Sequence, residues 1–114
     1  MTDTAAPASI FPAINYASPG SGTATLPDAS EELLAALMVQ GLRSLANSIA
    51  GDRAAHTVSV SLDMTGAAFL GGEVVIQTEV DRQTRTLAFM NGSLSCGGKV
   101  LLKATAIFRL ADKA

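Results

Sequence analysis

The fold is decided by residues 29–49, which read ASEELLAALMVQGLRSLANSI. Apolar residues recur there at three- and four-residue spacing, as they do on one face of an amphipathic helix. This apolar face consists of Leu33, Leu34, Leu37, Met38, Gly41, Leu42, Leu45 and Ile49. Asp28, with Glu31 three residues later, has the spacing of a capping box, and Gly51 is a stop signal. We therefore predict one long helix over residues 29–49.

Four strands are predicted after this helix, over residues 56–64, 73–82, 85–95 and 99–110. In the first of them, HTVSVSLDM, apolar and polar residues alternate, as they do in a half-buried strand. The segments DRQTR and SCGGK read as hairpin turns, so the last three strands should form an antiparallel meander. Before the helix, residues 10–16 and 23–27 are predicted to be short extended segments. The order indicates an α+β fold, in which a five- or six-stranded antiparallel sheet wraps around one central helix.

The composition is that of a single globular domain. The chain has 114 residues, 48% of them hydrophobic and 16% charged, which excludes a disordered protein. Aromatic residues make up 4%, so aliphatic side chains must supply the core. We predict a domain over residues 10–112, preceded by a loose tail over residues 1–9, which are small and polar.

Charge and cysteine content exclude several classes of partner. The net charge is −2 without a basic stripe, which argues against binding to nucleic acid. No uninterrupted apolar run approaches the roughly 18 residues of a membrane span, and no secretory signal is expected at the start of the chain. Cys96 is the one cysteine, which excludes an internal disulfide framework and a cysteine metal cluster. We expect a cytoplasmic protein without a metal site.

The predicted strands carry apolar residues on both faces, but the chain offers one helix to cover them. The face turned away from the helix would include Val75, Leu87, Phe89, Leu101 and Ile107, or the reverse set. A second subunit is the simplest cover for such a face. We therefore predict a homodimer, with a dimer of dimers as the larger alternative.

Residues 57–110 resemble the C-terminal two thirds of the hotdog-fold acyl-CoA thioesterases, especially their phenylacetic-acid-pathway (PaaI-like) branch. The likeness rests on an alternating strand ending near Asp63, a loop ending in glycine, and a V-x-R-x-x-R-x-L-A-F step over residues 80–89. A glycine-containing turn and a last strand with Ala104 and Phe108 follow. The resemblance implies hydrolysis of an acyl-CoA thioester in a cleft at a dimer interface. Coenzyme A would enter as part of the substrate, and no separate cofactor is expected.

Two features of that family are missing from this chain. The family usually carries a His-Gly-Gly loop before the helix and a carboxylate on the helix. Here the only histidine, His56, follows the helix, and Gln40 or its neighbour Val39 stands where the carboxylate would be. The alternative function is therefore a catalytically weakened hotdog protein that binds acyl-CoA or a small acyl ligand without turnover.

Thioester hydrolysis needs a carboxylate to activate water and backbone N–H groups to hold the oxyanion. The helix start, residues 29–34, is a candidate for the N–H groups, although a capped surface helix end is an equally good interpretation. Asp63 is the candidate base, against the alternative of a solvated acid at a strand end. Asn91 interrupts the most apolar strand and is a candidate to hold the water. Gln40 does not titrate, so its role would be to orient water or a carbonyl.

Three further residues are candidates for substrate binding. Ser44 continues the polar edge that Gln40 begins on the helix. Arg82 and Arg85 flank the turn DRQTR, where the resemblance implies contact with the phosphates of coenzyme A. We predict a cleft between two subunits, with Gln40 and Ser44 on the helix of one and Asn91 and Asp63 on the strands of the other.

Overall fold

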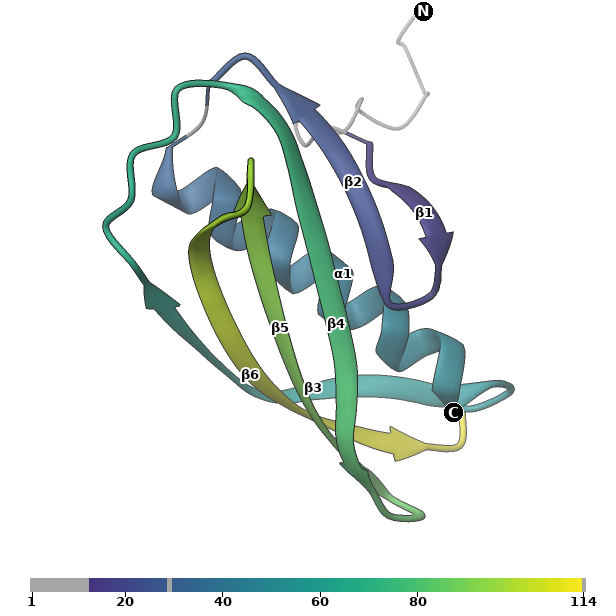
Figure 1. Ribbon diagram of the computed structural model, residues 1–114. Helices are drawn as coiled ribbons and strands as arrows, with labels where there is room; N and C mark the ends of the chain where they lie inside the picture. The colour runs from purple at the N-terminus through teal and green to yellow at the C-terminus, as the bar shows by residue number, and fades with distance from the viewer. Residues whose placement is uncertain (1–12, 29, 114) are drawn as a thin grey trace, which may run out of the picture.

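The computed structural model describes residues 13–28 and 30–113. Over these residues the chain forms one helix and six strands, with the long helix lying in the curve of the sheet (Figure 1). In chain order they are β1 (Asn15–Ser18), β2 (Ser21–Leu26), α1 (Glu31–Ala50), β3 (Ala54–Met64), β4 (Gly72–Gln83), β5 (Leu87–Cys96) and β6 (Lys99–Ala111). The strands form one antiparallel sheet in the order β1-β2-β4-β5-β6-β3. The predicted α+β hotdog arrangement is confirmed, with six strands in the described part of the chain. The predicted tail over residues 1–9 lies outside it.

The helix begins at Ser30, which replaces the predicted cap. Ser30 has an extended backbone, and its hydroxyl accepts a hydrogen bond from the Leu33 amide at 3.2 Å. Asp28 was therefore the wrong choice of cap, because α1 starts two residues later than a cap at that position requires. Gly51, with a φ of 63°, ends the helix as predicted. The three residues 51–53 then reverse the chain into β3, so α1 and β3 run in opposite directions.

The core lies between α1 and the concave face of the sheet. Its largest fully buried side chains are Phe108, Leu26, Leu37, Met38, Leu42, Ile76, Met90, Leu94, Leu102, Leu110 and Val74. By length and composition α1 is apolar enough to cross a membrane. Seven of its residues are nevertheless buried within the domain, so its apolar face serves as part of the core.

Two glycines allow α1 to lie close against the sheet. A Cβ atom on Gly41 of the helix would stand 2.6 Å from Cγ2 of Ile76. A Cβ atom on Gly92 of β5 would stand 2.4 Å from Cε of Met38. Both distances are far below the normal carbon–carbon contact of about 3.5–4.0 Å. Larger side chains at these two positions would force the helix or its neighbours to move.

The strand pairing confirms the predicted meander of β4, β5 and β6 and adds a longer-range pair. β3 pairs with β6, so β3 forms one edge of the sheet and β1 forms the other. The β3–β6 register shifts between Thr57 and Ser59, and Val58, which lies between them, is 57% exposed. Beyond this shift Val60, Leu62 and Met64 share the helix side of the sheet, as the alternation predicted.

The convex face of the sheet, opposite α1, is less apolar than the sequence suggested. Val75, Leu87, Phe89 and Ile107 are half-buried on it, as predicted. Leu101 is 3% exposed and lies at a register shift between β5 and β6, so its assignment to an open apolar face was wrong. Polar residues occupy the middle of this face: Gln77, Glu79, Asn91, Ser93, Lys103 and Thr105. Because its middle is polar, the convex face gives weaker support to the predicted dimer than expected.

Candidate functional site

The start of α1 presents backbone N–H groups at one end of the molecule. The Leu33 amide donates to the Ser30 hydroxyl, and the Leu34 amide donates to the Ser30 carbonyl at 3.1 Å. The amides of Glu31 and Glu32 are the first-turn donors outside these two bonds. Together with the helix dipole they favour a negatively charged group at this point. This part of the predicted oxyanion site thus has two backbone donors, flanked by two acidic side chains.

A loop over residues 65–71 packs beside the segment that leads into α1. Thr65 fixes the beginning of the loop, because its hydroxyl donates to the carbonyls of Val100 at 2.8 Å and Leu101 at 3.0 Å. At the other end, a Cβ atom on Gly71 would stand 2.1 Å from the carbonyl oxygen of Pro27. Only a glycine permits this approach, and Gly71 has a φ of 108°. The end of β3, the loop and the approach to α1 therefore meet at one end of the molecule.

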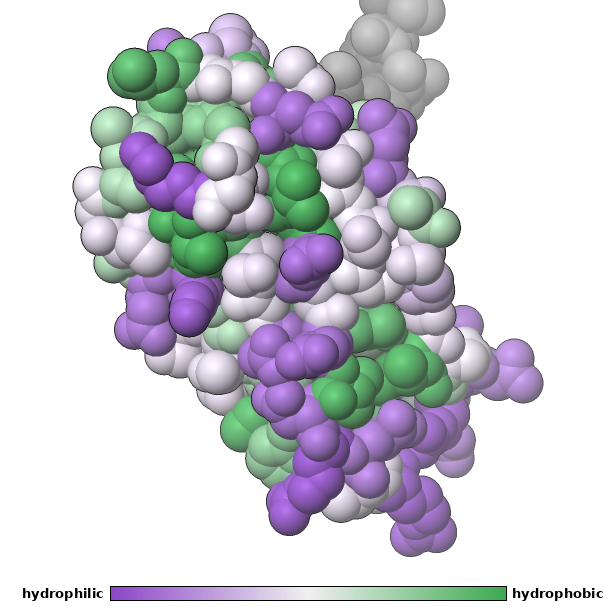
Figure 2. All heavy atoms as spheres, viewed as in Figure 1, coloured by the Kyte–Doolittle hydropathy of each residue, from purple (hydrophilic) through white to green (hydrophobic). Residues whose placement is uncertain are grey.

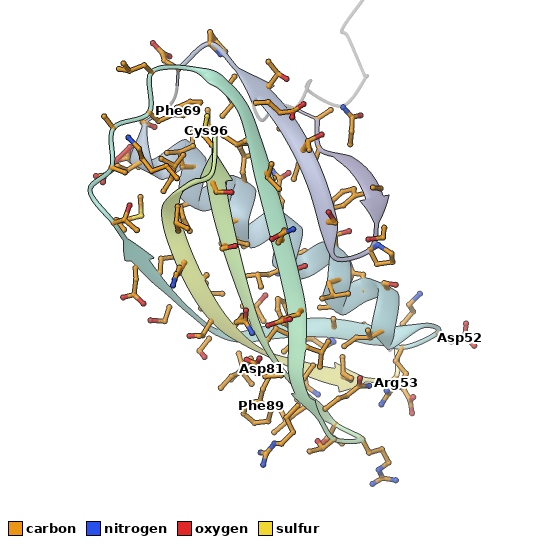
Figure 3. The ribbon with its side chains drawn as sticks, in the orientation of Figure 1. Asp52, Arg53, Phe69, Asp81, Phe89 and Cys96 are labelled. Atoms are coloured by element: carbon orange, nitrogen blue, oxygen red, sulfur yellow. The ribbon has the colours of Figure 1, made fainter. Side chains whose placement is uncertain are left out.

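Apolar side chains lie uncovered at the same end. Leu62 and Met64, on the helix side of β3, are 37% and 38% exposed. Leu70 in the loop is 91% exposed, while Phe69 is half-buried and packs against the core (Figure 3). We call Leu62 and Met64, together with Leu70 of the loop that follows β3, the β3 apolar strip. A cleft that accepts an acyl chain requires such apolar side chains next to polar groups that fix the reacting carbonyl.

The predicted residues do not converge within one chain. Gln40 and Ser44 are half-buried, one turn apart on the flank of α1. Asp63 and Asn91 lie on the convex face, since their neighbours Leu62 and Met90 take the helix side. The sheet thus separates the two predicted walls of the cleft in a single subunit. Whether a second subunit joins them stays a prediction.

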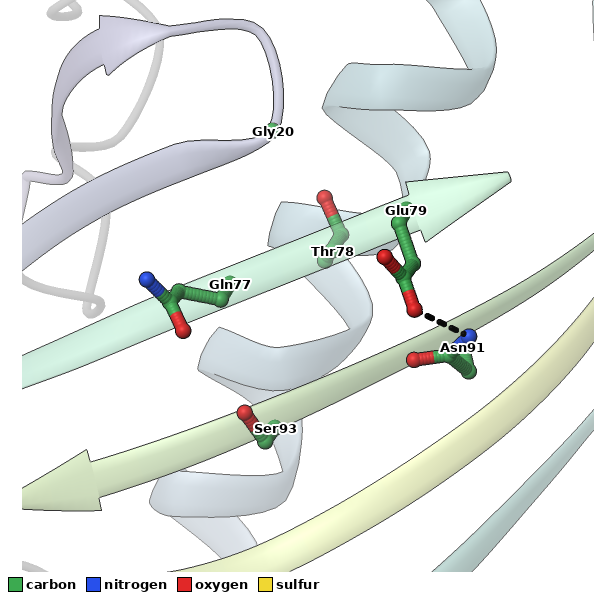
Figure 4. Close-up of a pocket in the computed structure, with 6 residues that line it drawn as sticks. All are labelled: Gly20, Gln77, Thr78, Glu79, Asn91 and Ser93. Carbon is green, nitrogen blue, oxygen red and sulfur yellow. Dashed lines mark hydrogen bonds between the residues drawn. The ribbon is translucent and has the colours of Figure 1, made fainter. Parts of the chain in front are cut away.

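Asn91 lies in a polar cleft on the convex face, with a volume of about 330 Å³ (Figure 4). The cleft is lined by Gly20, Gln77, Thr78, Glu79, Asn91 and Ser93. The Asn91 amide nitrogen donates to Glu79 Oε1 at 3.1 Å and also to Asp81 Oδ1. Its amide hydrogens are therefore directed at two carboxylates, and its carbonyl oxygen remains to accept a hydrogen bond. Asp63 stands opposite Lys103 on the same face and is exposed.

The two arginines of the β4–β5 hairpin point to different surroundings. The Arg82 guanidinium lies 4.7 Å from the centre of the Phe89 ring, in a cation–π contact on the convex face. Arg85 instead lines a second hollow, of about 470 Å³, at the end of the sheet. Two arginines that sequence reasoning missed, Arg53 and Arg109, line this hollow too. No motif marks them, because the pairing of β3 with β6 is what brings their segments together.

The described residues contain no group of three or more His, Cys, Asp or Glu side chains arranged to hold a metal. Cys96 is half-buried near the end of β5. Three candidate sites remain. They are the helix start with the β3 apolar strip, the polar cleft around Asn91, and the hollow lined by Arg53, Arg85 and Arg109, which we call the arginine hollow.

Comparison with known proteins decides the family. The family model for the acyl-CoA thioesterase N-terminal domain matches residues 33–109, more than half of the chain. The chain belongs to this acyl-CoA thioesterase family. No curated protein matches it. The predicted membership of the hotdog-fold acyl-CoA thioesterases is confirmed.

Solved structures share the fold of this acyl-CoA thioesterase domain at low sequence identity. A phenylacetic acid degradation-related protein from Ralstonia eutropha is 18% identical, with a TM-score of 0.72, over 86% of this chain and 83% of that one. A hypothetical thioesterase from Streptococcus pneumoniae, solved with coenzyme A, is 19% identical, with a TM-score of 0.70, over 90% of both chains. Zebrafish thioesterase superfamily member 2 is 19% identical, with a TM-score of 0.70, over 86% and 80%. These likenesses show that the fold is shared.

Proposed function

We propose that the protein binds acyl-CoA thioesters and hydrolyses them in a cleft formed by two subunits. The observation that carries this proposal is the arrangement at the end of β3. There the first-turn amides of α1 lie at the same end of the molecule as the β3 apolar strip, in a chain of the acyl-CoA thioesterase family. The pneumococcal neighbour solved with coenzyme A supports a ligand of this class. Coenzyme A would be part of the substrate, and the reaction requires no further cofactor.

The chemistry requires three actions. A carboxylate takes a proton from water as the water oxygen attacks the carbonyl carbon of the thioester. The amides of Glu31 and Glu32 hold the resulting oxyanion, since a helix start favours negative charge. The carbon–sulfur bond then breaks, the coenzyme A sulfur receives the proton, and the carboxylic acid is released.

Two positions compete for the role of base. Asp63 was predicted from its place at a strand end, but its side chain lies on the face of the sheet away from α1. Glu31 and Glu32 belong to the turn that supplies the oxyanion donors. Because base and oxyanion donors must act on the same carbonyl, the geometry favours Glu31 or Glu32.

The second subunit would pair along β3. This strand has 11 residues and lies at the edge of the sheet, so one side of its backbone has no neighbour within the described chain. An edge strand of this length with exposed apolar residues is a template for pairing. Antiparallel pairing of two copies would extend the sheet across the dimer and cover Val58 and Leu62. A homodimer fits the edge strand better than it fits the convex face, whose middle is polar.

Light scattering tests the dimer directly. The wild-type protein should show twice the chain mass of 11.6 kDa at micromolar concentration. Leu62→Lys should shift it toward the monomer, because a lysine on the edge strand opposes pairing. Leu70→Lys is the matched control, since it places the same charge at an exposed leucine outside β3. A wild-type mass of one chain would refute the dimer.

A panel of acyl-CoA thioesters with free-thiol detection tests hydrolysis. We expect turnover, and we expect Glu31→Gln or Glu32→Gln to lower kcat by about 100-fold or more, the usual effect of losing a general base. Asp63→Asn should leave kcat nearly unchanged. The reverse pattern would restore Asp63 as the base. Undiminished turnover in all three variants would refute both assignments.

The second candidate function is binding without turnover. A specific observation favours it: after its acidic first turn, α1 carries no carboxylate. In that case coenzyme A and its acyl thioesters would bind, no free thiol would be released, and Asp63→Asn would bind like the wild type. Gln40→Ala should weaken either function by about 1 kcal/mol, the value of one lost neutral hydrogen bond.

A further inference from the structure

Arg43 carries the one charge on α1 beyond its acidic first turn. Its side chain reaches from the helix to β3, where the guanidinium donates a hydrogen bond to the Thr57 hydroxyl. The central carbon of the guanidinium lies 5.9 Å from the centre of the Phe108 ring. Thr57 and Phe108 are both uncharged, so neither neutralises the arginine. An exposed positive charge is therefore held at a defined position on the helix side of β3.

This position lies at the open edge of the sheet. β3 is an edge strand, and Thr57 stands immediately before the register shift that leaves Val58 57% exposed. Thr57 pairs with Phe108, which is buried on the helix side, so Thr57 shares that side with Leu62 and Met64. Within one chain, the guanidinium and the β3 apolar strip therefore lie on the same side of β3, toward opposite ends of the strand.

Pairing of two β3 strands, as we propose for the dimer, would bring these two features together. An antiparallel pair about a two-fold axis keeps both helices on one side of the joined sheet. If the strands pair over their full length, Ala54 of one subunit meets Met64 of the other, and Thr57 comes close to Leu62 of the partner subunit. At about 3.3 Å per residue, a point two to three residues from the strand end lies about 7–10 Å from it. Each subunit would thus receive Arg43 of the partner subunit beside its apolar strip.

The site would then have three parts in order along one line. The first-turn amides of α1 come first, the β3 apolar strip follows, and Arg43 of the partner subunit stands at the inner end. An apolar strip suits the methylene groups of an acyl chain. A guanidinium donates two parallel hydrogen bonds to a carboxylate. This order matches an acyl chain whose far end is a carboxylate.

The charges around the site place that carboxylate at the far end of the chain. Glu31 and Glu32 stand at the start of α1 and would repel a second anionic group there. Residues 65–71, TGAAFLG, carry no charged side chain. Figure 2 shows hydrophobic side chains gathered over this loop between β3 and β4, at the upper left. Among these walls Arg43 is the one positive charge that an acyl group could meet.

We propose that Arg43 of the partner subunit selects acyl groups that end in a carboxylate, so that the substrates are coenzyme A thioesters of dicarboxylic acids. The inference rests on the proposed function for the thioester and for the cleft between two subunits. Arg43 is then a specificity-determining residue, because it binds the far end of the acyl group and takes no part in breaking the carbon–sulfur bond.

Calorimetric titration tests this selection without any need for turnover. The probes are thioether analogues of adipyl-CoA and hexanoyl-CoA, in which a methylene group replaces the thioester carbonyl. Their acyl portions have equal numbers of carbons and differ in the terminal carboxylate. We expect the wild type to bind the adipyl analogue about tenfold more tightly, the effect of one charge-assisted hydrogen bond. Arg43→Met should remove this preference without changing the affinity for the hexanoyl analogue, and Arg43→Lys should keep part of it.

Lys103→Met is the matched control, since it removes one positive charge at an exposed position on the convex face. It should leave the preference unchanged. Should Arg43→Met lose the fold in thermal unfolding or the dimer in light scattering, Arg43→Gln, which can still donate to Thr57, takes its place with the same expectation. Equal binding of both analogues by the wild type would overturn the proposal. Equal weakening of both analogues by the Arg43 variant would also overturn it, because Arg43 would then act on the coenzyme A portion.

Kinetics separate this proposal from the proposed function. If the thioesters are hydrolysed, Arg43→Met should raise KM for adipyl-CoA about tenfold and leave kcat and the KM for hexanoyl-CoA unchanged. Hydrolysis of both thioesters by the wild type with equal KM values would refute the selection and leave the thioesterase intact. An Arg43-dependent preference in binding, without hydrolysis of any thioester, would support the selection and refute the hydrolysis.

Discussion

Gly41→Ala tests how closely α1 lies on the sheet. In the structure a Cβ atom at this position would stand 2.6 Å from Cγ2 of Ile76 and 3.7 Å from Cγ2 of Thr78. The first distance is about 1 Å shorter than a normal carbon–carbon contact. Ile76 is 1% exposed, and its branched side chain has little rotational freedom, so it cannot easily give way.

Two effects of known size oppose each other in this variant. Alanine in a helix interior is favoured over glycine by about 0.8–1.0 kcal/mol. An extra methyl group forced into a filled core costs about 1–3 kcal/mol. With the contact so short we expect the second effect to exceed the first, and the free energy of unfolding to fall by about 1 kcal/mol.

A double-mutant cycle with Ile76→Ala isolates the contact. Ile76→Ala alone should cost about 2–5 kcal/mol, as large-to-small core changes do. In that background the opposing methyl group is gone, so Gly41→Ala should instead stabilise the protein by about 1 kcal/mol. The coupling between the two sites is then about 2 kcal/mol. Urea unfolding of the four proteins at one protein concentration measures it. A gain in stability of equal size in both backgrounds would refute the close contact.

Two further predictions concern the start of α1 and the loop that packs beside it. Ser30→Ala should lower the free energy of unfolding by about 1 kcal/mol, because the Leu33 amide loses its acceptor, and Ser30→Asp should keep most of it; urea unfolding decides. Gly71→Ala should cost more than about 1 kcal/mol, because of its positive φ and its contact with the Pro27 carbonyl. Thermal unfolding beside Gly66→Ala separates the two causes, since Gly66 has a φ of 78° with nothing within 4 Å; equal losses would exclude the contact.

Local patterns were enough to predict the elements of this fold. The spacing of leucines over residues 33–49 gave α1. The alternation after it gave the four long strands and their faces, except at Leu101, where the β5–β6 register shifts. Turn chemistry gave the meander, because Gly97 and Gly98 adopt the positive φ that the hairpin requires. What failed was local as well: Asp28 and Ser30 are both good caps, and spacing alone did not distinguish them.

The site was harder to predict because it depends on contacts between distant segments. Alternation already placed Asn91 on the face of the sheet opposite to that of Met90. It did not show that the partners of the Asn91 amide would be Glu79 and Asp81. Arg53 and Arg109 meet only because β3 pairs with β6. The pairing register of two strands so far apart in the chain is not encoded in any short stretch of sequence.

The pairing of β3 with β6 also imposes an order on folding. Paired residues are 38 positions apart at Met64–Leu102 and 57 apart at Ala54–Ala111, whereas Gln83 and Ala88 in the β4–β5 hairpin are five apart. Contacts between distant residues require larger loops to close, so they form late. During synthesis β3 leaves the ribosome before its partner exists, with both of its edges unpaired. β3, which we expect to join two folded subunits, is therefore also the last long strand to pair within one subunit. Until β6 has been synthesised, the new chain is exposed to mispairing at β3.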